Sequence, residues 1–123
     1  MYQDYYIQEY KSFLQDLLLF GQLKVDEVPQ DLRLCGGRSF YVTARRAARE
    51  RRDANAYVLA CRLQLQDMEA VEELSFHDEA EILRNVFVSL WFDSDYFKGE
   101  KVFRDFLEEQ KAAYPDAYRT FTA

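Results

Sequence analysis

The residues with the most obvious chemistry in this chain are five arginines that fall within eight positions. A guanidinium group is permanently charged and forms paired hydrogen bonds to phosphates and carboxylates. A block of such groups therefore indicates an anionic target, which is either the phosphate backbone of a nucleic acid or a set of protein carboxylates. The block consists of Arg45, Arg46, Arg49, Arg51 and Arg52.

Charge is distributed unevenly along the chain, and this bears on both targets. The formal net charge is −6, yet residues 33–66 hold eight basic and only two acidic residues, so both flanking segments are acidic. Such an asymmetry affects association more than fold. We expect the basic segment to pair with carboxylates of the same chain, to dock on another protein, or to contact phosphates.

Aromatic residues form a second group of candidates. The chain has ten Phe, nine Tyr and one Trp in 123 residues. Each ring buries on the order of 150–250 Å², so this is more aromatic surface than a small core needs. We predict that some of the rings near the two ends of the chain bind a partner. The candidates chosen are Tyr2, Tyr6, Tyr118 and Phe121.

Motifs of the common enzyme classes are missing from the sequence. It contains no phosphate loop, dinucleotide fingerprint, nucleophile elbow or paired-histidine metal motif. His77 is the only histidine and falls in the first turn of a predicted acidic helix, where a surface or capping role is favoured. Cys35 and Cys61 lack the close spacing of zinc ligands, so we expect them to be reduced and structural. We predict no catalytic residue, no metal and no cofactor.

Acidic clusters leave one enzymatic alternative open. Glu69, Glu72 and Glu73 are loosely similar to one half-site of the all-helical nucleotide pyrophosphohydrolases, which hold Mg²⁺ with acidic clusters on neighbouring helices. The resemblance implies a metal-dependent hydrolase. The second half-site is not recognisable in the sequence, so a solvated helix face is favoured.

Hydrophobic periodicity predicts the elements that must position these residues. Apolar residues recur at three- and four-residue steps in four segments, and each pattern is typical of an amphipathic helix. Gly36 and Gly37 are expected to break the chain before the second helix, and Trp91 is placed on the apolar face of the third. The predicted helices span residues 2–20, 39–66, 75–92 beginning at an N-cap Ser75, and from after Ser94 to Pro115.

These elements predict an all-α fold, a compact bundle of about four helices with a long Arg-rich second helix. Only four Gly and two Pro occur, which is few for a protein built from short strands and tight turns. The alternative is an α+β domain with a small antiparallel sheet. We expect residues 1–123 to be one domain, and residues 115–123 to be a flexible or loosely docked tail.

Composition and charge favour a non-enzymatic protein-binding module: an acidic helical adaptor, inhibitor or immunity-type protein that docks by charge complementarity. In size and charge the chain resembles small acidic helical proteins of phages and mobile elements, some of which imitate DNA. The alternative is a nucleic-acid-binding protein that uses the face of residues 45–52. A homodimer is also compatible with the charge pattern. No signal peptide or long apolar run is present, so we expect a cytoplasmic protein without a membrane contact.

Overall fold

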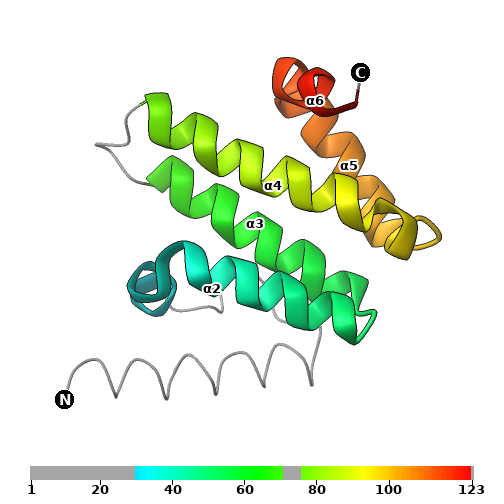
Figure 1. Ribbon diagram of the computed structural model, residues 1–123, viewed down its shortest axis with the longest axis horizontal. Coiled ribbons are helices and arrows are strands. Elements are labelled where there is room, and N and C mark those ends of the chain that lie inside the picture. Colours follow the sequence, from blue (N-terminus) through cyan, green and yellow to red (C-terminus); the bar gives the residue numbers. More distant parts are fainter. Residues whose placement is uncertain (1–29, 71–75, 123) are drawn as a thin grey trace. The chain divides into compact units, whose positions relative to one another are not determined.

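The computed structural model describes the backbone of residues 30–70 and 76–122, and the side chains of residues 40–69 and 79–119. This part of the chain forms five helices and no strand (Figure 1), so the all-α prediction is confirmed there and the α+β alternative is wrong. The predicted helix over residues 2–20 and the Ser75 cap lie outside the described residues. The helices are α2 (Gln30–Glu50), α3 (Ala54–Ala70), α4 (Phe76–Phe97), α5 (Lys101–Ala113) and α6 (Pro115–Thr122).

The chain divides into two compact units, Met1–Leu63 and Gln64–Ala123, and the boundary falls inside α3. The first unit holds α2 and the start of α3. The second holds the end of α3 together with α4, α5 and α6. Whether the two units behave as the single domain expected from length stays a prediction.

The long Arg-rich helix predicted over residues 39–66 is wrong in its continuity, because the chain turns at residues 51–53 between α2 and α3. The expected break at Gly36 and Gly37 is also wrong, since both glycines lie inside α2. A glycine within a helix costs roughly 1 kcal/mol relative to alanine, a penalty that a long helix can absorb. Helix α2 therefore continues 13 residues beyond Gly37, to Glu50.

Two backbone hydrogen bonds form a Schellman motif at the end of α2. The amide of Arg52 donates to the carbonyl of Arg49 at 3.0 Å, and the amide of Asp53 donates to the carbonyl of Ala48 at 2.9 Å. Arg52 has a φ of 55°, in the left-handed region that glycine usually fills at this position. A non-glycine residue held there costs about 1 kcal/mol or more. The helix ends here because these bonds satisfy its last carbonyls.

Asp53 begins the next helix. Its side-chain Oδ1 accepts a hydrogen bond from the amide of Ala56 at 3.0 Å, which is the geometry of an N-cap. A carboxylate at this position also lies at the positive end of the dipole of α3. A new helix thus begins at Asp53, although the apolar spacing continues from α2 into α3 without a break.

Apolar residues of α2 and α3 are buried largely as the predicted stripe requires. Phe40, Ala44 and Cys61 are completely buried, and the Cys61 thiol is reduced. Phe40 and Tyr41 also make an edge-to-face ring contact, with centroids 5.3 Å apart. The helical periodicity of this segment is therefore sound, although the segment is not one helix.

In the second unit, α4 packs against both α5 and α6, and α5 packs against α6. The fourth predicted helix was expected to restart after Ser94, but α4 continues to Phe97 and the turn falls at residues 98–100. Phe97 and Phe103 face each other across this turn, with ring centroids 5.5 Å apart, and both are buried. This aromatic contact fixes the hairpin of α4 and α5.

Residues 115–122 form helix α6. Whether this end of the chain is a flexible or loosely docked tail stays a prediction. Pro115 ends the run of α5, as expected, but it also begins α6, because proline is well tolerated at a first helical position. The ring of Tyr118 meets Phe87 of α4 edge to face, with centroids 6.0 Å apart. The ammonium group of Lys111 of α5 lies over the Tyr118 ring, 5.0 Å from its centroid. These contacts hold α6 on the other two helices.

Candidate protein interface

The arginine block does not form one uniform surface. Arg45 is buried, with 4% of its surface accessible, whereas Arg46, Arg51 and Arg52 are exposed and Arg49 is intermediate. Arg51 and Arg52 lie in the turn after α2, whereas Arg45, Arg46 and Arg49 lie within the helix. An external anion would therefore meet a smaller basic surface than five arginines suggest.

The terminal aromatic candidates are only partly described. Tyr2 and Tyr6 lie outside the described residues, and so does the side chain of Phe121. Tyr118 is half-buried and contacts both Phe87 and Lys111, which holds α6 in place. Its ring thus has a structural role within the second unit.

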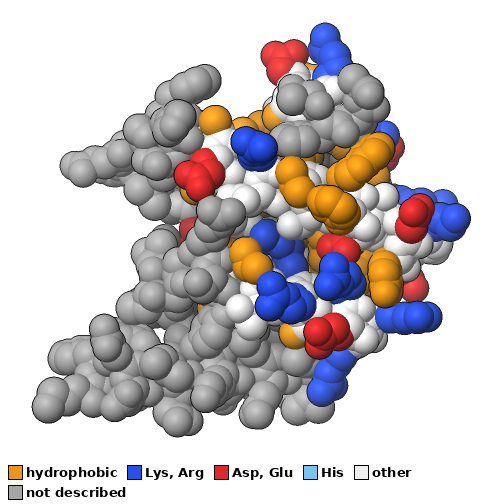
Figure 2. All heavy atoms as spheres, viewed as in Figure 1, with side chains coloured by type: hydrophobic (Ala, Val, Ile, Leu, Met, Phe, Trp, Pro, Cys, Tyr) orange, Lys and Arg blue, Asp and Glu red, His pale blue; other side chains and the backbone are white. Residues whose placement is uncertain are grey.

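Exposed aromatic residues are instead concentrated on α4, where the sequence analysis did not expect them. Trp91, Phe92 and Tyr96 have accessible fractions of 56%, 74% and 56%, and they are the large hydrophobic residues exposed within the described part of the chain. We call these three residues the α4 aromatic surface. Figure 2 shows hydrophobic side chains gathered on the molecular surface over α4. The placement of Trp91 on the inward face was wrong.

A rigid base supports the α4 aromatic surface. On the opposite side of the same helix, Val86, Phe87 and Leu90 are almost completely buried. Phe87 also contacts Tyr114 at a centroid distance of 6.3 Å, in addition to Tyr118. Because α4 is held by its buried face against α5 and α6, its exposed rings are presented on an ordered helix.

A helical projection would have found this surface. Phe92 lies about 180° away from the centre of the apolar stripe formed by Leu83, Val86, Phe87 and Leu90, at roughly 100° per residue. Trp91 projects to the edge of that stripe, and for a residue at the edge the sequence alone does not decide between burial and exposure. The signal available in the sequence was a large apolar residue on the polar side of a well-formed amphipathic helix.

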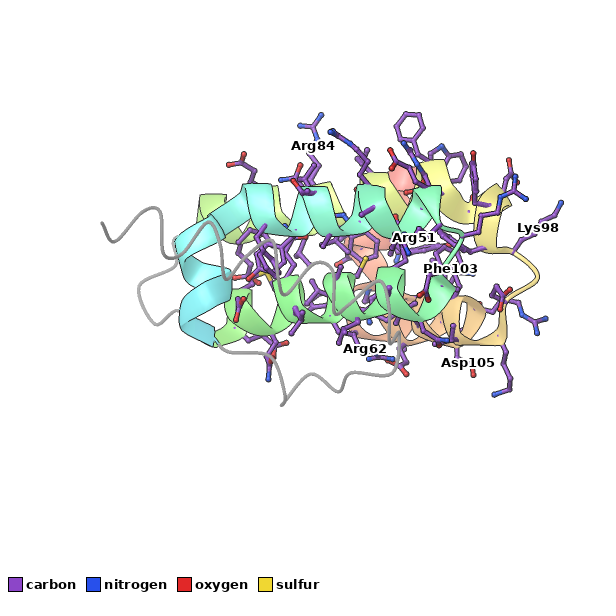
Figure 3. The ribbon with its side chains drawn as sticks, turned by 90° about the horizontal axis from the view of Figure 1, so that it is seen from below. Arg51, Arg62, Arg84, Lys98, Phe103 and Asp105 are labelled. Carbon is purple, nitrogen blue, oxygen red and sulfur yellow. The ribbon has the colours of Figure 1, made fainter. Side chains whose placement is uncertain are left out.

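Exposed charged side chains lie before, between and after the rings along α4. Arg84, Asp95 and Lys98 are exposed, and Figure 3 shows Arg84 and Lys98 projecting away from the helices while Phe103 lies among them. Glu81 is exposed one turn before Arg84. Apolar rings within a charged border are the usual composition of a protein interface.

The acidic cluster of Glu69, Glu72 and Glu73 is only partly described. No group of three or more His, Cys, Asp or Glu residues there is arranged to hold a metal ion. Glu69 is exposed and accepts a hydrogen bond from the hydroxyl of Tyr114 at 3.3 Å, while Glu72 and Glu73 lie outside the described residues. Burial, followed by the nearby charge of Glu69, raises the pKa of Tyr114 above its ordinary value. This pair joins the end of α3 to the start of α6.

Comparison with known proteins adds no relative to this picture: no family, no curated protein and no solved structure matches the chain. Among the described helices, none has both the length and the apolar character needed to cross a membrane.

Proposed function

We propose that this chain is a non-enzymatic protein-binding module and that the α4 aromatic surface is its contact site. The observation that carries the proposal is the exposure of Trp91, Phe92 and Tyr96 on a single helix. Trp and Tyr dominate the energetics of interfaces, because large rigid rings bury much area at a low cost in conformational entropy. A cluster of exposed rings on a folded domain is a mark of an interaction surface.

Charge gives the proposed contact its selectivity. Arg84 and Asp95 lie beside the rings on the same helix and are exposed to solvent. Exposed ion pairs add little affinity, yet they orient partners and reject wrong ones. The proposal thus keeps the charge-complementary docking expected from the sequence and moves it from the terminal aromatics to α4.

Site-specific photocrosslinking tests the proposal in cells that express the chain. Phe92 is replaced by p-benzoylphenylalanine, a phenylalanine with an added benzoyl group, and the control carries the same residue at Ala112, which is exposed on α5. We expect discrete protein adducts from position 92 and none from position 112. Equal labelling at both positions, or no adduct from position 92, would contradict the proposed function.

Nucleic-acid binding is retained as a second candidate because three arginines of the block are exposed, namely Arg46, Arg51 and Arg52. Each phosphate contact releases counterions, so binding of this kind weakens steeply as salt rises. Fluorescence anisotropy with mixed-sequence duplex and single-stranded probes measures it directly. We expect any salt-sensitive binding to disappear when these three arginines are changed to Ala.

A matched control removes the same amount of charge elsewhere, by changing Lys101, Arg104 and Arg119 to Ala, all of which are exposed. Loss of probe binding in both triple variants would show a non-specific effect of net charge. Absence of binding at low salt would eliminate this second candidate.

A further inference from the structure

The exposed side of α4 has a periodic row of residues of its own, separate from the apolar stripe on the buried side. Six positions follow one another at alternating steps of three and four, which is the spacing of a coiled-coil seam. All six are exposed except Val88, which is intermediate. We call this row the α4 seam. It consists of Glu81, Arg84, Val88, Trp91, Asp95 and Lys98, the last of which directly follows the helix.

Charges along the α4 seam are ordered so that the row is complementary to its own reverse. Read forward, it is acidic, basic, two apolar residues, acidic and basic. Read backward, every acidic position becomes basic and every basic position becomes acidic, while the apolar centre is unchanged. The six positions are also placed symmetrically about the midpoint between residues 89 and 90. A surface with this property fits a second copy of itself related by a two-fold axis.

We infer that the α4 seam binds the α4 seam of a second copy of this chain, with the two helices antiparallel. This inference rests on the proposed function and names the partner of the same surface. In an antiparallel pair of helices, residues at equal distances from the two-fold axis face each other. Arg84 therefore faces Asp95 of the second copy, and Glu81 faces Lys98 of the second copy.

Apolar contacts lie at the centre of this arrangement. Val88 packs against Trp91 of the second copy, and the symmetry repeats the contact, so both indole rings leave water. Phe92, which is 74% exposed in the single chain, lies directly beside the seam and extends the apolar area. Seam spacing of this kind brings helices together at a shallow crossing angle of about 20°.

The charge order also selects the direction of the pair. A parallel pair would place Arg84 against Arg84 and Asp95 against Asp95, so that every charged position would face a like charge. The antiparallel pair places opposite charges together at all four outer layers. Like-charge contacts of this kind are the usual means by which coiled coils reject a wrong orientation.

The contact involves one helix from each copy, so its area is at the small end of specific interfaces. Interfaces of that size are typically transient, and we expect a dissociation constant in roughly the micromolar range. The dimer should therefore form and dissociate within an accessible range of protein concentration.

Sedimentation equilibrium of the full chain from about 1 μM to about 1 mM tests the inference, because such a range spans a micromolar dissociation constant. We expect the mass to rise from that of one 14.7 kDa chain to that of two. Trp91 is the only tryptophan, so its emission should shift to the blue over the same range. A monomeric mass at every concentration would overturn the inference.

Charge exchange then identifies the surface. Arg84→Asp and Asp95→Arg each place like charges together twice in the dimer, and each should raise the dissociation constant at least about tenfold. The double variant Arg84→Asp with Asp95→Arg restores opposite charges and should recover the dimer. Arg104→Asp makes the same charge change on the exposed surface of α5 and should have no effect.

Two results would contradict the α4 seam even if a dimer forms. One is a dissociation constant that Arg84→Asp leaves unchanged, which would place the contact elsewhere. The other is a double variant that stays monomeric while its circular dichroism matches that of the original chain. Photocrosslinking at position 92 separates this inference from the proposed function, because adducts with a different protein alone would support the function and overturn the second copy.

Discussion

The arginine segment of α2 and the aromatic segment of α4 depart from expectation in opposite ways. Arg45, a residue type that is rarely buried, has only 4% of its surface accessible, whereas Phe92 has 74%. Burial of a guanidinium is costly unless it is compensated, so Arg45 contributes to the structure of its helix and not to an open surface. Exposure of a phenyl ring gains nothing in an isolated chain. A side chain whose exposure is unusual for its type, such as Phe92, therefore indicates a contact surface better than the residue type alone.

The largest effect on stability should be the difference between a substitution on the buried face of α4 and one on its exposed face. Phe87→Ala removes a buried ring that contacts Tyr114 and Tyr118, and it should lower the free energy of unfolding by about 3–5 kcal/mol. Phe92→Ala removes an exposed ring and should change it by about 0.5 kcal/mol or less. Urea unfolding at low protein concentration measures both, and similar losses in the two variants would remove the distinction between the faces.

A smaller effect should come from the helix start after the arginine segment. Asp53→Ala removes the hydrogen bond from the amide of Ala56 and should cost about 1 kcal/mol of unfolding free energy. Asn55→Ala, at an exposed position in the first turn of the same helix, serves as the control and should be close to neutral. If Asp53→Ala is also neutral in thermal unfolding, the α2–α3 turn does not depend on its cap.

The smallest effect should be a gain in stability. Arg52→Gly places glycine where φ is 55° and should raise the free energy of unfolding by about 0.5–1 kcal/mol, because the left-handed conformation no longer strains a side chain. Arg51→Gly, one residue earlier in the same turn and without a positive φ, should give no gain. A loss of stability in Arg52→Gly would mean that the arginine side chain contributes more than its backbone conformation costs.

Much of the fold follows from periodicity, because burial of one helix face depends on residue spacing alone. The buried positions Phe40, Ala44, Val86 and Phe103 all lie within the helical segments that periodicity predicts. The end of α2 was missed because a Schellman motif usually carries glycine, and here Arg52 occupies the left-handed position. An aspartate such as Asp53, inside a segment of continuous helical spacing, does not by itself indicate a helix N-cap.

The candidate site was less predictable than the fold for a different reason. Whether a residue at the edge of an apolar stripe is covered depends on where neighbouring helices end, and sequence does not contain that information locally. Trp91 is such a residue, and it lies on the exposed side, whereas Phe87 of the same helix contacts Tyr114 and Tyr118. Tyr118 is the reverse case, a predicted contact residue that α6 brings against α4.

The turn at residues 51–53 also affects how proteases would act on the chain. Enzymes that cleave after basic residues need an accessible backbone that is not helical, and Arg51 and Arg52 lie exposed between two helices. One cut after Arg51 would leave both α2 and α3 unsevered. It would also divide the charge unequally, giving an almost neutral amino-terminal fragment and a strongly acidic carboxy-terminal fragment.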